Sequence, residues 1–290
     1  MPTISGRLGR YIVAKEVLSR VDIFRLGITN SRLMNSLGRS SAMPNCFEMK
    51  VIQHGSSRTI LHCGAHLGEE SALYRRCGAE EIFWVEAQPS KVSILRDLFG
   101  SKNVFSGVLA QESGRKVPFF ITSNSLSSSS REINPNPWNV AIEEVVQLET
   151  VKLDDITRDI YLRTRILPDL LVLDLQGAEY DAILGADFLI SKINFLIVEF
   201  SNYQLYKNQK TILDILSIPS LQPFTMAYKL EESGHGEALF VRTSELKFSK
   251  RVRSLIILNH FLIKTKVSML LRRILIKTGL VLQQLNKNSS

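Results

Sequence analysis

Short apolar runs alternate with amphipathic stretches from residue 47 onward in this 290-residue chain. Compact apolar runs are typical of buried strands, whereas apolar positions three or four residues apart predict helices. The pattern predicts strands at 59–63, 82–86, 104–108, 170–174, 194–199 and 239–242. It predicts helices at 68–76, 90–98, 178–189 and 209–217. Strands that alternate with helices indicate an α/β domain with a doubly wound, mainly parallel sheet.

A serine-rich stretch at residues 123–138 interrupts this alternation and is predicted to be a long loop, because two prolines end it. The flanking segments 116–121 and 145–153 have the composition of strands, so we expect a β insertion around the loop. The two ends of the chain differ from this central part, since both are basic and helical in pattern. We therefore expect a basic helical N-terminal extension at 1–45, an α/β domain at 46–246 and a basic amphipathic C-terminal extension at 247–290.

The formal net charge of +8 is concentrated at the two ends of the chain. Residues 251–290 contain eight basic and no acidic residues, and residues 1–40 contain seven basic and two acidic ones, which leaves −5 on the remaining 210. A groove that follows nucleic-acid phosphates needs its basic residues on the folded body, so we expect no nucleic-acid partner. The C-terminal stripe fits contact with an anionic membrane surface, and equally packing against the N-terminal extension or a second copy of the chain.

The three cysteines, Cys46, Cys63 and Cys77, match no metal-ligand or disulfide spacing and are expected to be buried thiols. The first residues lack the apolar stretch of a secretory signal, and no apolar run approaches the ~18 residues of a membrane span. These features predict a cytoplasmic protein without a metal site. Any membrane contact would then be peripheral, at the inner face.

Ligands of doubly wound sheets bind at the carboxyl ends of the central strands, so the residues that close each strand are the candidates for a site. Gly64 and Gly68 bracket a tight turn after the first strand, which exposes backbone amides at the start of a helix. Glu86 closes the second strand, where a carboxylate can accept both ribose hydroxyls of a nucleoside. The glycines alone also fit a structural turn, and only with Glu86 do they indicate a nucleoside site.

Two fingerprints of nucleotide sites are missing from the chain. It lacks the GxGxxG spacing of dinucleotide sites and the GKS or GKT of a P-loop. A nucleoside ligand held without a phosphate clamp therefore fits best, and S-adenosylmethionine is the common ligand of that kind. A nicotinamide oxidoreductase remains an alternative, as does a non-catalytic membrane-peripheral or assembly protein with a degenerate nucleoside pocket.

Two further predicted strands end in carboxylates. Asp174 closes the fourth and precedes Gly177, a position that suits either a site in the crevice or a helix cap. Glu199 closes the fifth, where apolar surroundings make an unpaired carboxylate costly to bury. Glu179 falls in the first turn of a helix, so its expected role is to stabilise the helix dipole.

Seven segments of the chain resemble the ordered motifs of the FkbM-type methyltransferase family over about residues 55–242. They are ILHCGAHLGEESALYRRCGA, IFWVEAQPS, SNSLSSSS, VKLDDI, LLVLDLQGAEYDAILGA, FLIVEFS and GEALFVR. The LDLQGAE segment, with IVEFS downstream and LDD upstream, is the specific part. The resemblance implies a class I, Rossmann-like methyltransferase fold and S-adenosylmethionine as cofactor. It also implies O-methylation of a hydroxyl on a sugar, a glycan or glycolipid, or a secondary metabolite.

The same resemblance implies roles for individual residues. It assigns Gly64, Ala65, His66 and Gly68 to the methionine side of the cofactor, Glu86 with Ala87 to its ribose, and Asp174 to the neighbourhood of the methyl group. His62 departs from the family, whose members usually have aspartate at this position. We count it among the cofactor-binding candidates and expect it to hydrogen-bond the glycine turn. As a cation it would lie unfavourably near a sulfonium, which implies weaker cofactor binding than aspartate would give.

Methyl transfer to a sugar hydroxyl is helped by a base that accepts the hydroxyl proton as the new bond forms. The candidates are Asp174, Glu199 and His235, the last in a loop that enters the final strand near the expected cleft. Tyr203, Tyr206 and the serine-rich stretch offer aromatic faces and hydroxyls that suit a polyol acceptor. His235 and the serines fit ordinary surface loops equally well.

Overall fold

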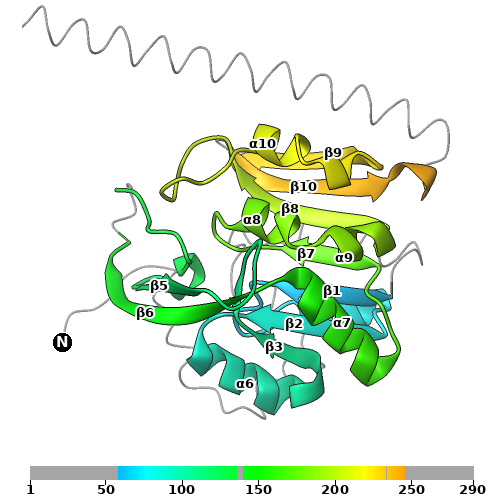
Figure 1. The fold of residues 1–290 in the computed structure, drawn as a ribbon, viewed down its shortest axis with the longest axis horizontal. Helices are drawn as coiled ribbons and strands as arrows, with labels where there is room; N and C mark the ends of the chain where they lie inside the picture. Colours follow the sequence, from blue (N-terminus) through cyan, green and yellow to red (C-terminus); the bar gives the residue numbers. More distant parts are fainter. Residues whose placement is uncertain (1–57, 136–139, 233, 246–290) are drawn as a thin grey trace, which may run out of the picture.

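A computed structural model describes residues 58–135, 140–232 and 234–245, which centre on a seven-stranded sheet (Figure 1). The strand order is β3-β2-β1-β7-β8-β10-β9. The first five of these strands run parallel, and β10 is antiparallel to both β8 and β9. The bounds are β1 (Thr59–Cys63), β2 (Glu81–Glu86), β3 (Val104–Ser106), β7 (Leu170–Leu173), β8 (Phe195–Ser201), β9 (Phe224–Glu232) and β10 (His235–Arg242). This arrangement confirms the doubly wound, mainly parallel sheet expected from the sequence.

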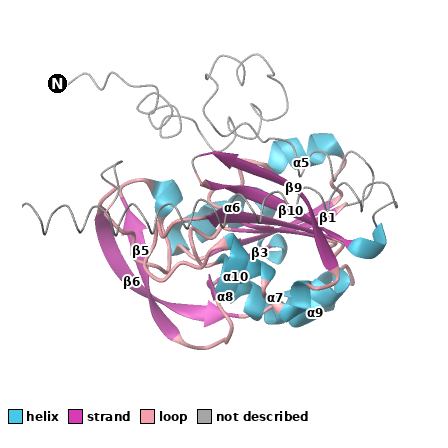
Figure 2. Ribbon diagram, turned by 90° about the horizontal axis from the view of Figure 1, so that it is seen from above, coloured by secondary structure: helices cyan, strands magenta, loops and turns pink. Residues whose placement is uncertain are grey.

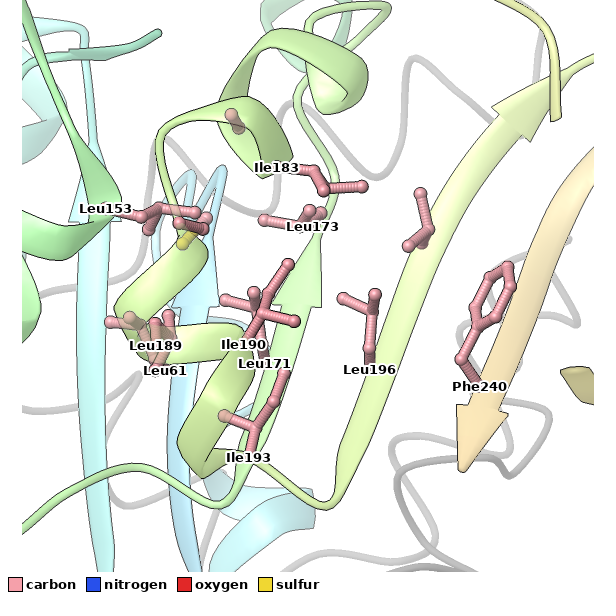
Figure 3. Packing of buried hydrophobic residues seen from close by; sticks show 14 of the residues in the cluster. Leu61, Leu153, Leu171, Leu173, Ile183, Leu189, Ile190, Ile193, Leu196 and Phe240 are labelled. Atoms are coloured by element: carbon pink, nitrogen blue, oxygen red, sulfur yellow. The ribbon is translucent and has the colours of Figure 1, made fainter. Parts of the chain in front are cut away.

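Helices cover both faces of this sheet (Figure 2). One face packs against α5 (Ser71–Cys77) and α6 (Pro89–Phe99), and the other against α7 (Leu153–Thr164), α8 (Glu179–Leu184), α9 (Asp187–Lys192) and α10 (Ile212–Leu216). On the face that α7 to α10 cover, Leu171, Leu173 and Leu196 of the sheet pack against Ile183 of α8 and Ile190 of α9 (Figure 3). Strands buried on both faces need apolar side chains at every position, which explains why β7 shows no alternation.

The predicted β insertion is present beside the sheet. β5 (Lys116–Thr122) and β6 (Ile142–Val151) form an antiparallel ribbon, and β4 (Val108–Leu109) pairs with the end of β6. Figure 1 shows the ribbon projecting at one side of the molecule. The described part of the serine-rich stretch lies between β5 and β6 and returns to β5 through a bridge between Phe120 and Ser129. Short 3₁₀ helices lie at Ser101–Asn103, Ser125–Ser127, Pro219–Leu221 and Thr243–Glu245.

Several elements differ from the sequence-based prediction. The predicted strand at 104–108 divides at Gly107 into β3 and β4, which belong to different sheets, and the helix α7 was not predicted. The segment 145–153 ends its strand at Val151 and begins α7 at Leu153, and β9 was not predicted at all. β9 is an edge strand that pairs as an antiparallel hairpin with β10, in which Glu232 lies opposite His235. The apolar pattern of its own residues did not predict it. The expected helix at 178–189 divides into α8 and α9 at Gly185, where a Cβ would lie 2.3 Å from the Ala110 carbonyl oxygen.

The extensions at 1–45 and 247–290 lie outside the described residues, as does Cys46. The terminal domain boundaries, the membrane contact and the association with a second copy therefore stay predictions. Cys63 is buried, as expected. Within the described ranges, no helix has the length and hydropathy to cross a bilayer. The same ranges contain no cluster of histidine, cysteine and acidic residues suited to a metal ion.

Candidate active site

The loop after β1 is held tightly against the ends of two neighbouring strands. Gly64 has φ +85°, and the amides of Gly64 and Ala65 both donate to the Val85 carbonyl oxygen at 3.0 Å. A Cβ on Gly64 would lie 1.8 Å from the carbonyl oxygen of Asp174. Only glycine permits this backbone approach, so the sequence places the glycine turn and Asp174 side by side at the rim.

Glu86 faces the glycine loop from the end of β2. The side chain is buried, and its Oε2 accepts the His66 amide at 2.9 Å. Its Oε1 accepts the amides of Ala87 and Gln88 at 2.9 and 2.8 Å. A carboxylate has about four acceptor positions, so these three bonds orient Glu86 and leave capacity for a ligand hydroxyl. Glu86 therefore lies beside the glycine loop, and its role toward a ribose stays a prediction.

His66 connects the glycine loop to the serine-rich stretch. It adopts a left-handed conformation with φ +46°, and its Nδ1 lies 2.8 Å from Glu69 Oε1. Its Nε2 lies 3.0 Å from Ser125 Oγ, and the Lys91 ammonium donates to the Ser125 carbonyl oxygen at 2.6 Å. The stretch around Ser125 therefore covers the rim above β1 and β2, a placement that no local sequence pattern indicated.

His62 lies apart from these rim contacts. Its side chain is buried, its Nδ1 lies 2.8 Å from the Tyr74 hydroxyl, and its ring centroid lies 5.4 Å from that of Trp84. Tyr74 and Trp84 both belong to the core that α5 and α6 cover. The sequence pointed to a hydrogen bond with the glycine turn, whereas the structure gives one to α5 within an aromatic pocket.

This pocket changes the expected effect of restoring the family's residue. We expect His62→Asp to lower the free energy of unfolding by roughly 2–3 kcal/mol, because it buries a carboxylate among aromatic rings and removes the Tyr74 partner. Urea denaturation measures this loss, and the neutral His62→Asn serves as the control with a smaller loss. A His62→Asp protein that is as stable as the unaltered one and binds S-adenosylmethionine more tightly would contradict this expectation. It would show that residue 62 contributes to cofactor binding.

The carboxyl ends of β7 and β8 bring all three candidate bases together. Asp174 follows β7 and is exposed, Glu199 lies in β8, and His235 begins β10 opposite Ser201. His235 Nε2 lies 3.1 Å from Glu199 Oε1. The amide of Gln176 joins the group, since its Nε2 donates to Asp174 Oδ1 at 2.6 Å and to Glu199 Oε2 at 2.9 Å. Asp174 and Glu199, predicted to close strands, and His235, predicted in a loop, thus form one cluster. In the structure β8 continues to Ser201, and His235 is the first residue of β10.

Burial and the neighbouring carboxylate charge shift the pKa values of Glu199 and His235. Burial, and then the Asp174 charge, raises the pKa of Glu199 well above its usual range. Burial lowers the pKa of His235, although the Asp174 charge opposes this. Both shifts favour the neutral forms of Glu199 and His235 and oppose an ion pair between them. The exposed Asp174 is the carboxylate available to a ligand.

Glu179 and Tyr206 support the turn that carries Gln176. Glu179 Oε1 accepts the amides of Leu175 and Gly177 at 2.9 and 3.1 Å, and burial raises its pKa to about 7. The Tyr206 hydroxyl lies 2.9 Å from Gln176 Oε1, and burial raises the pKa of this phenol. Glu179 thus binds turn amides, a more specific role than the dipole effect expected for it.

A cavity of about 430 Å³ opens at the ends of β2 and β3, beside Glu86. Ala87, Pro89, Ser106 and Gly107 contribute to its lining. Between the first two, Gln88 Oε1 is a buried acceptor that has no hydrogen-bond partner among the described residues. Gln88 is not part of the cavity lining, and it is the volume of the cavity, next in the chain to Glu86, that suits a nucleoside base.

Comparison with known proteins adds to this geometry. Residues 62–225 match the family described as the methyltransferase FkbM domain. The chain is 28% identical over 199 residues to the 2-O-methyltransferase NoeI of Sinorhizobium fredii (strain NBRC 101917 / NGR234), which covers 63% of this chain and 79% of that protein. Among solved structures, the O-methyltransferase from Bacillus cereus in complex with SAH matches with a TM-score of 0.41 and 11% identity, covering 80% and 94% of the two chains. Cofactor-bound Rv0187 from MTB matches with a TM-score of 0.39 and 13% identity, covering 83% and 92%.

Proposed function

Since the chain belongs to the FkbM methyltransferase family, we propose that this S-adenosylmethionine-dependent enzyme methylates a hydroxyl of a sugar or glycan. The observation that carries the proposal is the cluster of Asp174, Glu199 and His235 beside the glycine loop. The relative named as a 2-O-methyltransferase supports oxygen as the methylated atom. Exposed serines and a buried tyrosine hydroxyl beside the cluster suit an acceptor rich in hydroxyls.

The residues of the rim divide into a cofactor side and an acceptor side. Glu86 and the backbone of Gly64, Ala65, His66 and Gly68 would hold S-adenosylmethionine, with Ala87 at the cavity beside its base. When bound, this cofactor supplies an electrophilic methyl group on a sulfonium. No side chain has to activate that methyl group, so the chain's contribution is to align the acceptor and remove its proton.

We assign proton removal to Asp174. Its carboxylate is exposed at the rim and held through Oδ1 by Gln176, whereas the side chain of Glu199 is 18% exposed and its raised pKa favours the protonated form. His235 is neutral near pH 7 but directs Nε2 at Glu199. Asp174 therefore accepts the hydroxyl proton, and the half-buried pair of Glu199 and His235 lies next to it, linked through Gln176.

Binding and labelling experiments test this function directly. Calorimetry of the protein with S-adenosylhomocysteine and with NAD should show binding of the first ligand only. Radiolabelled methyl groups from S-adenosylmethionine should then appear in fractionated glycans and glycolipids. Binding of S-adenosylhomocysteine without transfer to any fraction would favour a non-catalytic protein, and preference for NAD would favour an oxidoreductase.

A single substitution tests the ribose assignment. Glu86→Gln should weaken the binding of S-adenosylhomocysteine by about tenfold to a hundredfold, because a hydrogen bond to a charged group contributes about 1.5–3 kcal/mol. Titration calorimetry measures the affinity. Glu81→Gln, at the opposite end of β2, is the matched control and should leave the affinity unchanged. Equal affinities in the two variants would reduce Glu86 to a support for the backbone turn.

A further inference from the structure

Gln176 occupies a conformation that is unusual for its residue type. Its φ is +54°, and Gly177 follows with φ +99°. Left-handed conformations in residues other than glycine are uncommon and tend to occur at functional sites. The Gln176 carbonyl oxygen accepts Ser129 Oγ at 2.8 Å, and the Tyr206 ring lies 3.0 Å from the place that a Cβ on Gly177 would occupy. The backbone of Gln176 is therefore fixed from the serine-rich stretch and from Tyr206.

The side chain of Gln176 uses both ends of its amide. Nε2 donates one hydrogen toward Asp174 Oδ1 at 2.6 Å and the other toward Glu199 Oε2 at 2.9 Å. Oε1 lies 2.9 Å from the Tyr206 hydroxyl, which donates to it. The Tyr206 hydroxyl also lies 3.2 Å from the Ser127 carbonyl oxygen. An amide is a neutral side chain that offers two donors and an acceptor, and this site uses all three.

We propose that Gln176 is a positioning residue: its amide fixes the orientation of the Asp174 and Glu199 carboxyl groups and connects them, through Tyr206, to the serine-rich stretch that covers the rim. This inference rests on the proposed function of Asp174 as the base. The Asp174 and Glu199 carboxyl groups already share a hydrogen bond, which contributes to the raised pKa of Glu199. Without the amide, both groups would lose a donor to their charged forms, and the proton between them would be held more tightly. The base would then be protonated over part of the working pH range.

The electrostatic surroundings of Glu199 determine how this effect is measured. Among the described residues, five titratable side chains surround Glu199. They are Asp174 after β7, Glu179 of α8, Tyr206 in the loop after β8, and His235 and Glu237 of β10. Among them His235 is a natural reporter, because its Nε2 lies 3.1 Å from Glu199 Oε1. The ring resonances of His235 therefore respond when a carboxyl group of the cluster gains or loses a proton.

The experiment is a histidine NMR titration of the full-length protein, with His235→Gln used to assign the His235 resonance. Gln176→Met keeps the length of the side chain but removes its hydrogen bonds. It should move the carboxyl titration sensed by His235 upward by about one pH unit, since losing a hydrogen bond to the charged form favours the protonated form. Gln176→Glu adds a carboxyl group and should move it at least as far. Gln222→Met, at an exposed glutamine, should leave the titration unchanged.

Methyl transfer and cofactor affinity complete the test. With an acceptor fraction from the labelling experiment, Gln176→Met should lower kcat about tenfold near pH 7 and recover part of it at higher pH. Its affinity for S-adenosylhomocysteine should change less than twofold, because Gln176 makes no described hydrogen bond to the glycine loop. A folded Gln176→Met or Gln176→Glu whose His235 titration and pH profile match the unaltered protein would overturn the inference. Failure of the unaltered protein to bind S-adenosylhomocysteine would instead reject the proposed function.

Discussion

Replacement of Asp174 by asparagine should lower methyl transfer by about two to four orders of magnitude, the usual contribution of a positioned general base. The amide cannot accept the acceptor proton, yet it keeps the shape of the side chain. It can also still accept the hydrogen bond from Gln176 Nε2. The substitution therefore removes the chemistry with little change in packing, and binding of S-adenosylhomocysteine should stay within a few-fold of that of the unaltered protein.

The measurement is initial-rate label transfer across pH 6–9, with calorimetry of S-adenosylhomocysteine alongside. Asp169→Asn is the matched control, because Asp169 precedes β7 at the opposite edge of the sheet and accepts the Thr59 amide at 3.3 Å. This control should transfer methyl groups at the normal rate. Retained activity in Asp174→Asn would reject Asp174 as the base and make His235 the next candidate for that role.

The second large effect is structural and concerns Gly64. Gly64→Ala should lower the free energy of unfolding by at least about 3 kcal/mol and abolish binding of S-adenosylhomocysteine. The added Cβ would lie 1.8 Å from the Asp174 carbonyl oxygen and 2.8 Å from its carbonyl carbon. Both contacts are with backbone, so no side-chain rotation relieves them. The loop and the end of β7 would have to separate, which would open the site at its centre.

Gly78 provides the control that separates this clash from backbone strain. It has φ +104°, comparable to the +85° of Gly64, but a Cβ there would meet no atom within 4 Å. Gly78→Ala should therefore show only the cost of a left-handed alanine, about 1–2 kcal/mol, with normal ligand binding. Chemical denaturation of both variants measures the difference. Equal losses in the two proteins would contradict the close approach of Gly64 and Asp174.

Much of the candidate site was predictable because parallel strands end at a common edge. Asp174 and Glu199 close apolar segments of the sequence, and the neighbouring strands β7 and β8 bring them to the same rim. Glu86 followed from the same rule, and the glycine turn from the need for close backbone approach. His235 lies near Glu199 because the antiparallel β10 begins where β8 ends, although the sequence predicted a loop at this position.

The sequence by itself thus determined most strands of the sheet and the carboxylates near their ends, since strands buried on both faces require uninterrupted apolar runs. It placed the end of β8 at Glu199, whereas the strand continues to Ser201, and it missed β9. Only the tertiary structure decided how those carboxylates are linked. Gln176 and Glu199 are 23 residues apart, and Ser125 and His66 are 59 residues apart, so no local period encodes their contacts. His62 gained its aromatic partners from α5 and β2 in the same way. Such contacts depend on the packing of distant elements, and a hydrophobic pattern records only which face of each element is buried.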